Sequence, residues 1–387
     1  MSTRVHSPVR IFVIALVVAL VLAVAGSSYA QPAVDRIRDR QLSVASVEAL
    51  GIVTFPTGYE FAGTEVGGLS GIAFDARRDV YYAISDDGAA PRFYTMAIDV
   101  SDGSLDDGDV TFLDVTLLKQ RGNVPYPPGT VDAESIVQRR SGPLYISSEG
   151  EIAASPPSNP FVNQYNLTGS LTGILPLPEK FLPGGANSVR DNLSFEGLAA
   201  TPNGEWLYTA TENALEADGP VATLTESSPS RVLEYELDSG RPGREFVYVV
   251  SPIPKAPEPP DEFADNGLSE LLALDNRGTF VVMERSFAVG VGNTIRLFET
   301  SIQGATDVSG MEVLGPPGSY EPMSKELIAD FEEDLGISPD NLEAMRFGPT
   351  LPDGRRLMIV LSDNNFNPSQ ITQVIAVAVE LELVNGD

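Results

Sequence analysis

Two carboxylates bracket one short stretch of the sequence, SFEGLAATPNGEWLYTATENA at residues 194–214. Glu196 precedes a short apolar run, a turn follows, and Glu212 comes after a second run rich in β-branched and aromatic residues. This pattern predicts a β-hairpin, and in an antiparallel hairpin the start of one strand lies beside the end of the next. The two acids are therefore expected side by side, where they suit metal binding or proton transfer.

The same hairpin recurs along the chain, in units that begin at residues 68, 132, 194, 267 and 341. Each unit opens with Ser or Glu at what we call its leading position and closes with an acid at its trailing position. The leading residues are Ser70, Glu134, Glu196, Ser269 and Glu343. The expected trailing acids are Asp86, Glu149, Glu212, Glu284 and Asp363.

Further strand-like runs follow each hairpin, which gives most units the four strands of one propeller blade. The fifth unit supplies only three strands, and an extra strand over residues 43–55 is expected to complete its blade and close the ring. We therefore predict an all-β fold, a single β-propeller of five four-stranded blades over residues 43–387. A sixth blade built from residues 215–230 and 287–340 is the alternative.

Two further elements are expected in the fourth unit, besides its hairpin and the strand TIRLFET at residues 294–300. A weak strand near residues 310–314 would complete its blade. A helix is predicted over residues 324–336, because its apolar residues fall on one helical face and Gly336 is typical of a helix end. These apolar residues are Leu327, Ile328, Phe331 and Leu335.

The composition narrows the available chemistry. The chain of 387 residues has no cysteine and a single histidine, His6, which lies in the N-terminal leader described below. Thiol nucleophiles, Ser-His-Asp triads and His-ligated zinc are thereby excluded from the folded part. The net charge of -29, from 54 acidic and 25 basic residues, disfavours nucleic acid and anionic membranes as partners.

Residues 1–30 have the features of a signal peptide. A short basic segment precedes the apolar run IFVIALVVALVLAVAG, and SSYA has the small residues of a cleavage site after Ala30. We expect residues 31–42 to be a flexible segment and the mature chain to be a periplasmic or extracellular monomer without membrane association. An uncleaved anchor is the alternative.

The hairpins would form the innermost strands of the blades, and their leading and trailing residues would then meet at one end of the central channel. Eight of these ten positions carry carboxylates, which cannot all stay ionised without a counter-charge. A divalent cation resolves this conflict, and Ca²⁺ is favoured because it accepts six to eight oxygen ligands. The predicted calcium ligands are Ser70, Glu134, Glu196, Ser269 and Glu343.

The repeated hairpins resemble those of the bacterial phytase-like family, also described as esterase-like activity of phytase. The resemblance lies in GLSGI…YAISDDG, SFEGLA…LYTATEN, GLSELLAL…VVMERSF and NLEAMRF…LSDNNF, and extends over about residues 50–385. It implies a β-propeller that hydrolyses phosphate esters with calcium. The order Ser, Glu, Glu, Ser, Glu at the leading positions is also similar to the calcium ring of calcium-activated nucleotidases, a type of apyrase.

If the protein is such a hydrolase acting on a small phosphorylated substrate, we expect other residues near the channel mouth to act in proton transfer and substrate binding. A general base is expected among Asp86, Asp87, Glu149 and Glu212. Substrate-binding groups are expected among Arg285, Arg346, Asn213 and Asn364. A non-catalytic binding module stabilised by calcium is the alternative, and a glycosidase with a carboxylate pair is a third hypothesis.

Overall fold

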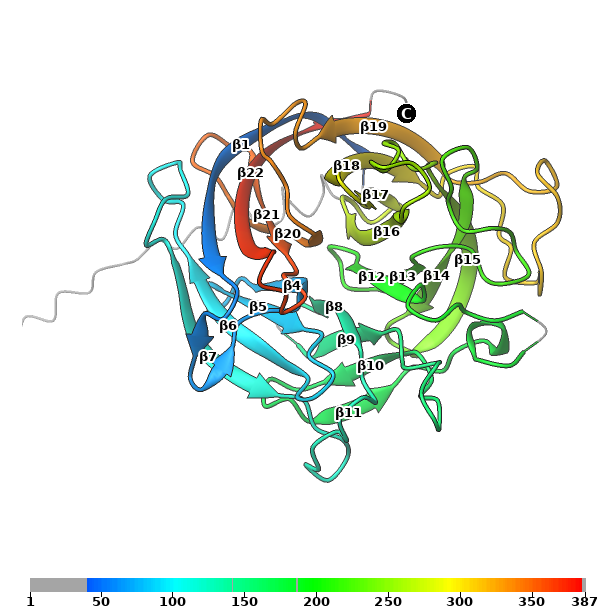
Figure 1. Ribbon diagram of the computed structural model, residues 1–387, viewed down its shortest axis with the longest axis horizontal. Helices are drawn as coiled ribbons and strands as arrows, with labels where there is room; N and C mark the ends of the chain where they lie inside the picture. The colour runs from blue at the N-terminus through cyan, green and yellow to red at the C-terminus, as the bar shows by residue number, and fades with distance from the viewer. Residues whose placement is uncertain (1–39, 141, 186, 385–387) are drawn as a thin grey trace, which may run out of the picture.

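The computed structural model describes residues 40–140, 142–185 and 187–384, so the predicted signal peptide and most of the predicted flexible segment lie outside the described residues. Five four-stranded antiparallel sheets stand around a central axis, as the blades of a propeller (Figure 1). This arrangement confirms the predicted fold and its five blades. Within the described ranges, no helix is long and apolar enough to cross a bilayer.

The strands are described most simply by their distance from the axis. The innermost strands are β4 (Leu69–Asp75), β8 (Ala133–Gln138), β12 (Phe195–Ala200), β16 (Ala264–Ala273) and β20 (Leu342–Thr350). The second strands are β5 (Val80–Ser85), β9 (Leu144–Ser148), β13 (Trp206–Thr211), β17 (Thr279–Ala288) and β21 (Arg356–Ser362). Each innermost strand contacts the innermost strands of the blades on either side, which closes the ring.

The outer half of each blade follows the same order. The third strands are β6 (Arg92–Ile98), β10 (Phe161–Tyr165), β14 (Ser228–Glu236), β18 (Gly292–Ser301) and β22 (Ile371–Leu383). The outermost strands are β7 (Val110–Leu117), β11 (Leu171–Ile174), β15 (Arg241–Val250), β19 (Ser324–Asp330) and β1 (Leu42–Pro56). A short hairpin of β2 (Glu60–Phe61) and β3 (Thr64–Glu65), and one 3-10 turn at Glu179–Phe181, complete the described elements.

The predicted completion of the last blade by the N-terminal strand is confirmed. β1 pairs with β22 in an antiparallel ladder from Leu42↔Leu383 to Pro56↔Ile371, and the two strands run together along the upper left of Figure 1. The remainder of this blade, β20 to β22, comes from the end of the described chain. One sheet therefore joins both ends of the propeller.

The apolar core is divided among the interfaces between blades. Five large clusters of buried side chains each combine residues from two neighbouring blades. In one of them Leu69 and Tyr94 of the first blade pack with Ile359 and Val374 of the last. The period-two alternation of the strands explains this arrangement, because a central strand buries one face against each neighbouring blade.

The predicted helix over 324–336 is wrong. Residues Ser324–Asp330 form strand β19, which pairs with β18 and takes the place of the fourth strand expected near 310–314. The chain then turns at Asp330, whose carboxylate accepts hydrogen bonds from the backbone N–H groups of Glu332 and Glu333 at 3.1 and 3.2 Å. Leu327, placed on the apolar face of the predicted helix, is 52% exposed on the edge of the blade.

Residues 310–314 form a loop instead of a strand. This loop covers the outer strand of the third blade, where Val308 and Leu314 pack against Val247. In this loop, the carbonyl oxygen of Met311 accepts hydrogen bonds from Lys180 at 2.9 Å and from Arg231 at 3.0 Å. The prediction of a strand at residues 310–314 is therefore also wrong.

Candidate metal centre

A β-bulge places the leading residue of every blade. The ladder between the innermost and second strands loses its register at the leading position in all five blades. Leu69 faces Ser85 and Gly71 faces Ile84, for example, so Ser70 between them has no partner. A bulge redirects the extra residue out of the regular pleat, and here the recurring bulge sets the leading residues near the channel axis.

The leading residues are all buried, but they fall into two groups. Glu134, Glu196 and Glu343 line the cavity at the mouth of the channel. Ser70 and Ser269 do not line it; their hydroxyls lie 3.4 Å from the carbonyl oxygens of Gly68 and Met283. The carboxylates are thus the leading groups that reach the cavity.

The trailing positions follow directly after the second strands. In four blades the residue there is Asp86, Glu149, Glu212 or Asp363, as expected. Each of these residues donates its backbone N–H to the residue two positions before the leading residue, at 2.8–3.0 Å. The repeated hydrogen bond fixes the trailing acids beside the leading residues.

The fourth blade differs from the expected alignment by one residue. Leu268 pairs with Glu284, which is the place held by Ser85, Ser148, Thr211 and Ser362 in the other blades. Arg285 therefore holds the trailing position, and the assignment of Glu284 to it is wrong. The Glu284 carboxylate instead accepts hydrogen bonds from Tyr248 and Lys325.

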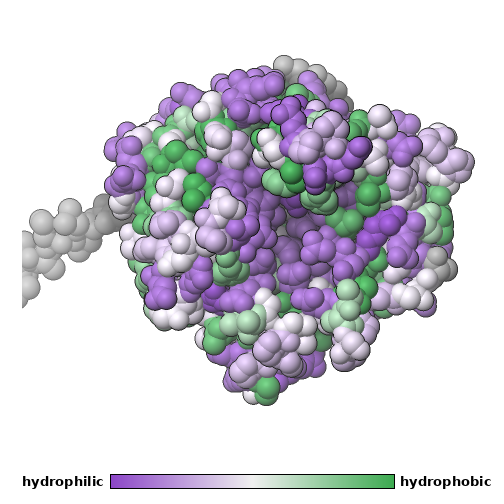
Figure 2. Space-filling model, viewed as in Figure 1, coloured by the Kyte–Doolittle hydropathy of each residue, from purple (hydrophilic) through white to green (hydrophobic). Residues whose placement is uncertain are grey.

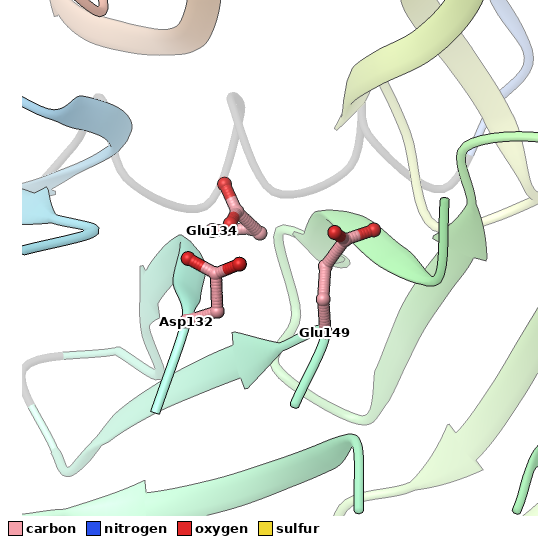
Figure 3. A group of neighbouring side chains, drawn as sticks. All are labelled: Asp132, Glu134 and Glu149. Atoms are coloured by element: carbon pink, nitrogen blue, oxygen red, sulfur yellow. The ribbon is translucent and has the colours of Figure 1, made fainter. Parts of the chain in front are cut away.

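Two groups of carboxylates lie close enough to share a cation. Asp132, Glu134 and Glu149 form one group, and Glu149, Glu196 and Glu212 form the other, with one oxygen of each member within 4.8 Å of the others. Figure 3 shows the first group, with its carboxylates facing one open space next to β8 and β9. Glu149 belongs to both groups, so it occupies the centre of the acidic region.

The cavity around these groups has a volume of about 790 Å³, and we call it the acidic mouth. Among the described residues that line it, ten are acidic and a single one, Arg285, is cationic. The space-filling view likewise shows a hydrophilic hollow at the centre of the propeller (Figure 2). The mouth has the charge and the oxygen donors that hard divalent cations require.

The pKa values of these acids are raised. Burial is the largest cause, and it places the pKa of Glu134, Glu149 and Glu196 well above the usual range, with neighbouring carboxylates adding to the effect. Burial also raises the pKa of Asp86 to about 8 and that of Asp132 to about 6. Without a cation, part of this cluster is therefore protonated at neutral pH.

Arg285 supplies the positive charge that the cluster contains. Its guanidinium lies 3.2 Å from Glu212, 3.0 Å from Asp265 and 3.7 Å from Glu343. Burial opposes the charged form, but these carboxylates outweigh it and raise the pKa of Arg285. The arginine offsets only part of the negative charge, since it contacts one side of the cluster.

The donor set fits a calcium ion. One oxygen of Asp86 is buried without a hydrogen-bond partner among the described residues, as expected for a group that awaits a ligand. The carboxylates of Glu134, Glu149 and Glu196 provide the hard oxygen donors that Ca²⁺ prefers. These acidic groups could therefore hold a metal ion.

Four further residues from the sequence prediction lie elsewhere. Asp87 pairs with Arg92 and accepts the N–H of Ala89. Asn213 and Asn364 are buried, and their side chains hydrogen-bond to neighbouring backbone, Asn213 to Asn266 and Ala222, and Asn364 to Gly68 and Phe366. Arg346 lines a second cavity at the far ends of the innermost strands.

Several residues at the acidic mouth were missed from the sequence. Asp132 and Asn341 stand two positions before the leading glutamates Glu134 and Glu343, and all four line the cavity. Strand alternation would have assigned them to the same face. Asp265 contributes through its contact with Arg285, which depends on the register of β16 with β17 and has no local signal in the sequence.

Three solved structures illustrate the distant similarities of this chain. An endo-arabinase from Bacteroides thetaiotaomicron matches with a TM-score of 0.45 and 12% identity, over 86% of this chain and 99% of that chain. A putative glucose dehydrogenase from Thermus thermophilus matches with a TM-score of 0.36 and 12% identity, over 85% and 100%. A gluconolactonase from Xanthomonas campestris gives 0.33 and 10%, over 88% and 97%.

These distant structural similarities do not assign the chain to a family, but a comparison with family models does. No curated protein matches the sequence. The model of the phytase-like family, described as esterase-like activity of phytase, matches residues 64–366. This range includes all five leading and all five trailing positions. The chain therefore belongs to the phytase-like family.

Proposed function

We propose that the protein is an exported, calcium-dependent phosphoric ester hydrolase, with its site at the acidic mouth. The observation that carries this proposal is the pair of carboxylate groups that share Glu149 at a cavity with one cationic side chain among its described lining residues. Membership of the phytase-like family supports the reaction class. The substrate would be a small phosphorylated molecule, and the apolar leader of residues 11–26 supports export.

The ion would be held by the acids that meet at Glu149. Glu134 and Asp132 reach it from the second blade, and Glu196 and Glu212 reach it from the third. Bound calcium would supply positive charge that offsets the phosphate and makes water more acidic. This charge is needed, because the acidic mouth alone repels an anionic substrate.

Side chains of the protein would orient the phosphate and accept the proton. Arg285 would orient the phosphate, since its Nε–H is buried without a hydrogen-bond partner among the described residues and a guanidinium matches phosphate oxygens. Asp86 would accept the proton of the attacking water. One of its carboxylate oxygens is buried at the mouth without a hydrogen-bond partner among the described residues, so this oxygen is available to accept a proton.

Hydrolysis of p-nitrophenyl phosphate, its bis-ester, ATP and phytate tests the proposal, each with calcium and after removal of metal. We expect turnover of at least one compound only with calcium, and a loss of about 10²-fold or more in Asp86→Asn. Glu216→Gln, on an exposed residue outside the cavity, should keep full activity. Turnover that is unaffected by metal removal and by Asp86→Asn would contradict the proposal.

A calcium-stabilised binding module remains the second candidate, because the group of Glu149, Glu196 and Glu212 joins the second blade to the third. An ion bound there would link the second blade to the third and stabilise the ring without any chemistry. This function predicts calcium binding and a raised Tm together with no turnover of any of the four compounds. The same assays therefore distinguish the two candidates.

A further inference from the structure

The channel has a second mouth, at the opposite ends of the innermost strands from the acidic one. Phe74, Gln138, Ala200 and Thr350, at or next to the last residues of four of these strands, line a cavity of about 900 Å³ there. None of the residues that line the acidic mouth contributes to it. The two cavities are therefore separate sites at the two faces of the propeller.

Five arginines line this second cavity: Arg77, Arg139, Arg140, Arg346 and Arg356. Among the described residues of the lining, Asp79 is the one carboxylate. The whole sequence contains only 25 basic residues against 54 acidic ones, so this local excess runs against the composition of the protein. We call this cavity the arginine mouth.

Contacts within the protein hold two of these guanidinium groups in place. Arg139 donates from Nε to the carbonyl oxygen of Gly204 at 2.8 Å and from Nη2 to Asp238 at 2.5 Å. Arg356 lies over the ring of Phe347, with its Cζ 4.8 Å from the ring centre, and donates to the carbonyl oxygen of Gly348 at 3.3 Å. Positive groups that are already oriented lose less entropy when an anion binds.

Arg346 lies near a buried acid that the protein itself binds. Its neighbour Glu270 accepts hydrogen bonds from the Ser135 hydroxyl at 2.7 Å and the Leu198 N–H at 2.8 Å. Burial raises the pKa of Glu270 to about 8, and the charge of Arg346 is among the influences that lower it.

A buried hydroxyl accompanies the arginines. The Tyr81 hydroxyl has no hydrogen-bond partner among the described residues, although the side chain is only 2% exposed. It lies against Gly348, which lines the cavity: a Cβ placed on Gly348 would be 2.1 Å from this oxygen. Burial raises the pKa of Tyr81, so it stays a neutral hydrogen-bond donor beside the arginine mouth.

We propose that the arginine mouth binds a small oxyanion with at least two negative charges, of the phosphate or phosphate-ester class. Guanidinium groups offer paired N–H donors that match phosphate oxygens, and they remain charged at any physiological pH. The cavity volume of about 900 Å³ lies in the range of small-ligand pockets, and a net charge of -29 repels long polyanions. Binding here needs no calcium, unlike binding at the acidic mouth.

Calorimetry on the metal-free full protein tests this site, with inorganic pyrophosphate and inorganic phosphate as probes in EDTA. We expect both to bind, and pyrophosphate to bind more tightly because it carries more charge. The double variant Arg346→Gln/Arg356→Gln should weaken pyrophosphate binding about tenfold or more, since hydrogen bonds between charged groups are lost. Affinity should also fall as NaCl is raised, because the attraction is electrostatic.

A control variant separates the arginine mouth from a general effect of lost positive charge. Arg121→Gln, on an exposed loop outside both cavities, should bind pyrophosphate as the wild type does. If the double variant does not fold, Arg140→Gln on an exposed residue should weaken binding about threefold or more. No binding to the wild type, or equal binding to the variants of the arginine mouth, would overturn the proposal, whether or not the protein is a hydrolase.

Discussion

Glu149 is the residue on which the acidic mouth depends most. It is the one acid shared by the two carboxylate groups, and the N–H of Ser194 in the next blade donates to its side chain. This hydrogen bond orients the carboxylate across the interface between the second and third blades. Its trailing position follows from the hairpin repeat, so the residue itself was identifiable from the sequence, whereas its central place was not.

Replacement of Glu149 tests this central place. Glu149→Gln should weaken calcium binding more than Glu196→Gln, because Glu196 belongs to only one of the two groups. We expect a loss of at least about tenfold for Glu149→Gln, since even residues that only support metal ligands contribute that much. Isothermal titration with calcium measures both, and exposed Glu216→Gln is the control. Equal affinities in all three variants would show that the ion is not bound at Glu149.

Arg285 shows why the sequence repeat alone could not define the site. In the other blades a Ser or Thr precedes the trailing acid, but the fourth blade has Glu284 followed by Arg285. An alignment that searches for acids selects Glu284, and a shift of one residue along a strand reverses the face on which a side chain lies. The Ser or Thr that recurs at this position in the other four units gives the correct register.

Arg285→Gln should make the protein depend on calcium for its stability. The change leaves Glu212, Asp265 and Glu343 without their cation, and breaking a buried ion pair costs about 3–5 kcal/mol of the free energy of unfolding. Thermal unfolding of metal-free protein should show this loss at pH 8, and excess calcium should restore part of it. A variant as stable as the wild type without metal would mean that Arg285 does not balance the acids.

At the level of the elements, close contact between innermost strands supports the bulges. Gly197 directly follows the leading residue Glu196, and a Cβ there would lie 2.5 Å from Leu271 Cδ2 and 2.7 Å from its backbone N. Neighbouring strands therefore approach each other at a point where only glycine fits. The glycine in the FEG sequence is explained by this contact.

Gly197→Ala should accordingly lower the free energy of unfolding by about 1–3 kcal/mol or more, because the backbone of β16 must move. The matched control is Gly310→Ala, where the added Cβ would meet no atom within 4 Å. That change should alter stability by no more than about 0.5 kcal/mol. Denaturant unfolding of both variants gives the comparison, and similar effects would argue against the close approach at Gly197.

The elements were predictable where the repeat defined them and less so elsewhere. The hairpins, the five blades and the strand that completes the last blade followed from alternation and spacing. Strand β19 did not, because its apolar residues recur with the period of a helix while its pairing with β18 decides its conformation. The contact of Asp265 with Arg285 joins residues 20 positions apart through register, which periodicity does not reveal.

At the scale of the whole molecule, the buried acids should give an unusual pH dependence. Their folded pKa values are raised, to about 8 for Asp86 and about 7 for Glu212, mainly by burial, whereas an unfolded carboxyl titrates near pH 4. Between these values the folded state binds more protons than the unfolded state. The free energy of unfolding of the metal-free protein should therefore fall as the pH rises from about 4 to about 8.

Melting curves at pH 5 and pH 8 measure this effect. Protein passed over a chelating resin should have a lower Tm at pH 8 than at pH 5, by about 1–2 °C for each kcal/mol lost at this chain length. Calcium should raise the Tm more at pH 8, because it binds the deprotonated acids of the folded state. A Tm that does not respond to calcium at pH 8 would contradict the prediction of a metal site.

The pairing of β1 with β22 also affects how the polypeptide is made. The ribosome delivers β1 early, yet the strand that covers it emerges only after residues 57–370 have been synthesised. During that interval its N–H and C=O groups have no native partner, and such an edge is prone to pair with other chains. Translation therefore passes through an intermediate in which the last blade is unfinished, and chaperones that shield extended segments would have their main task at the first strand of this protein.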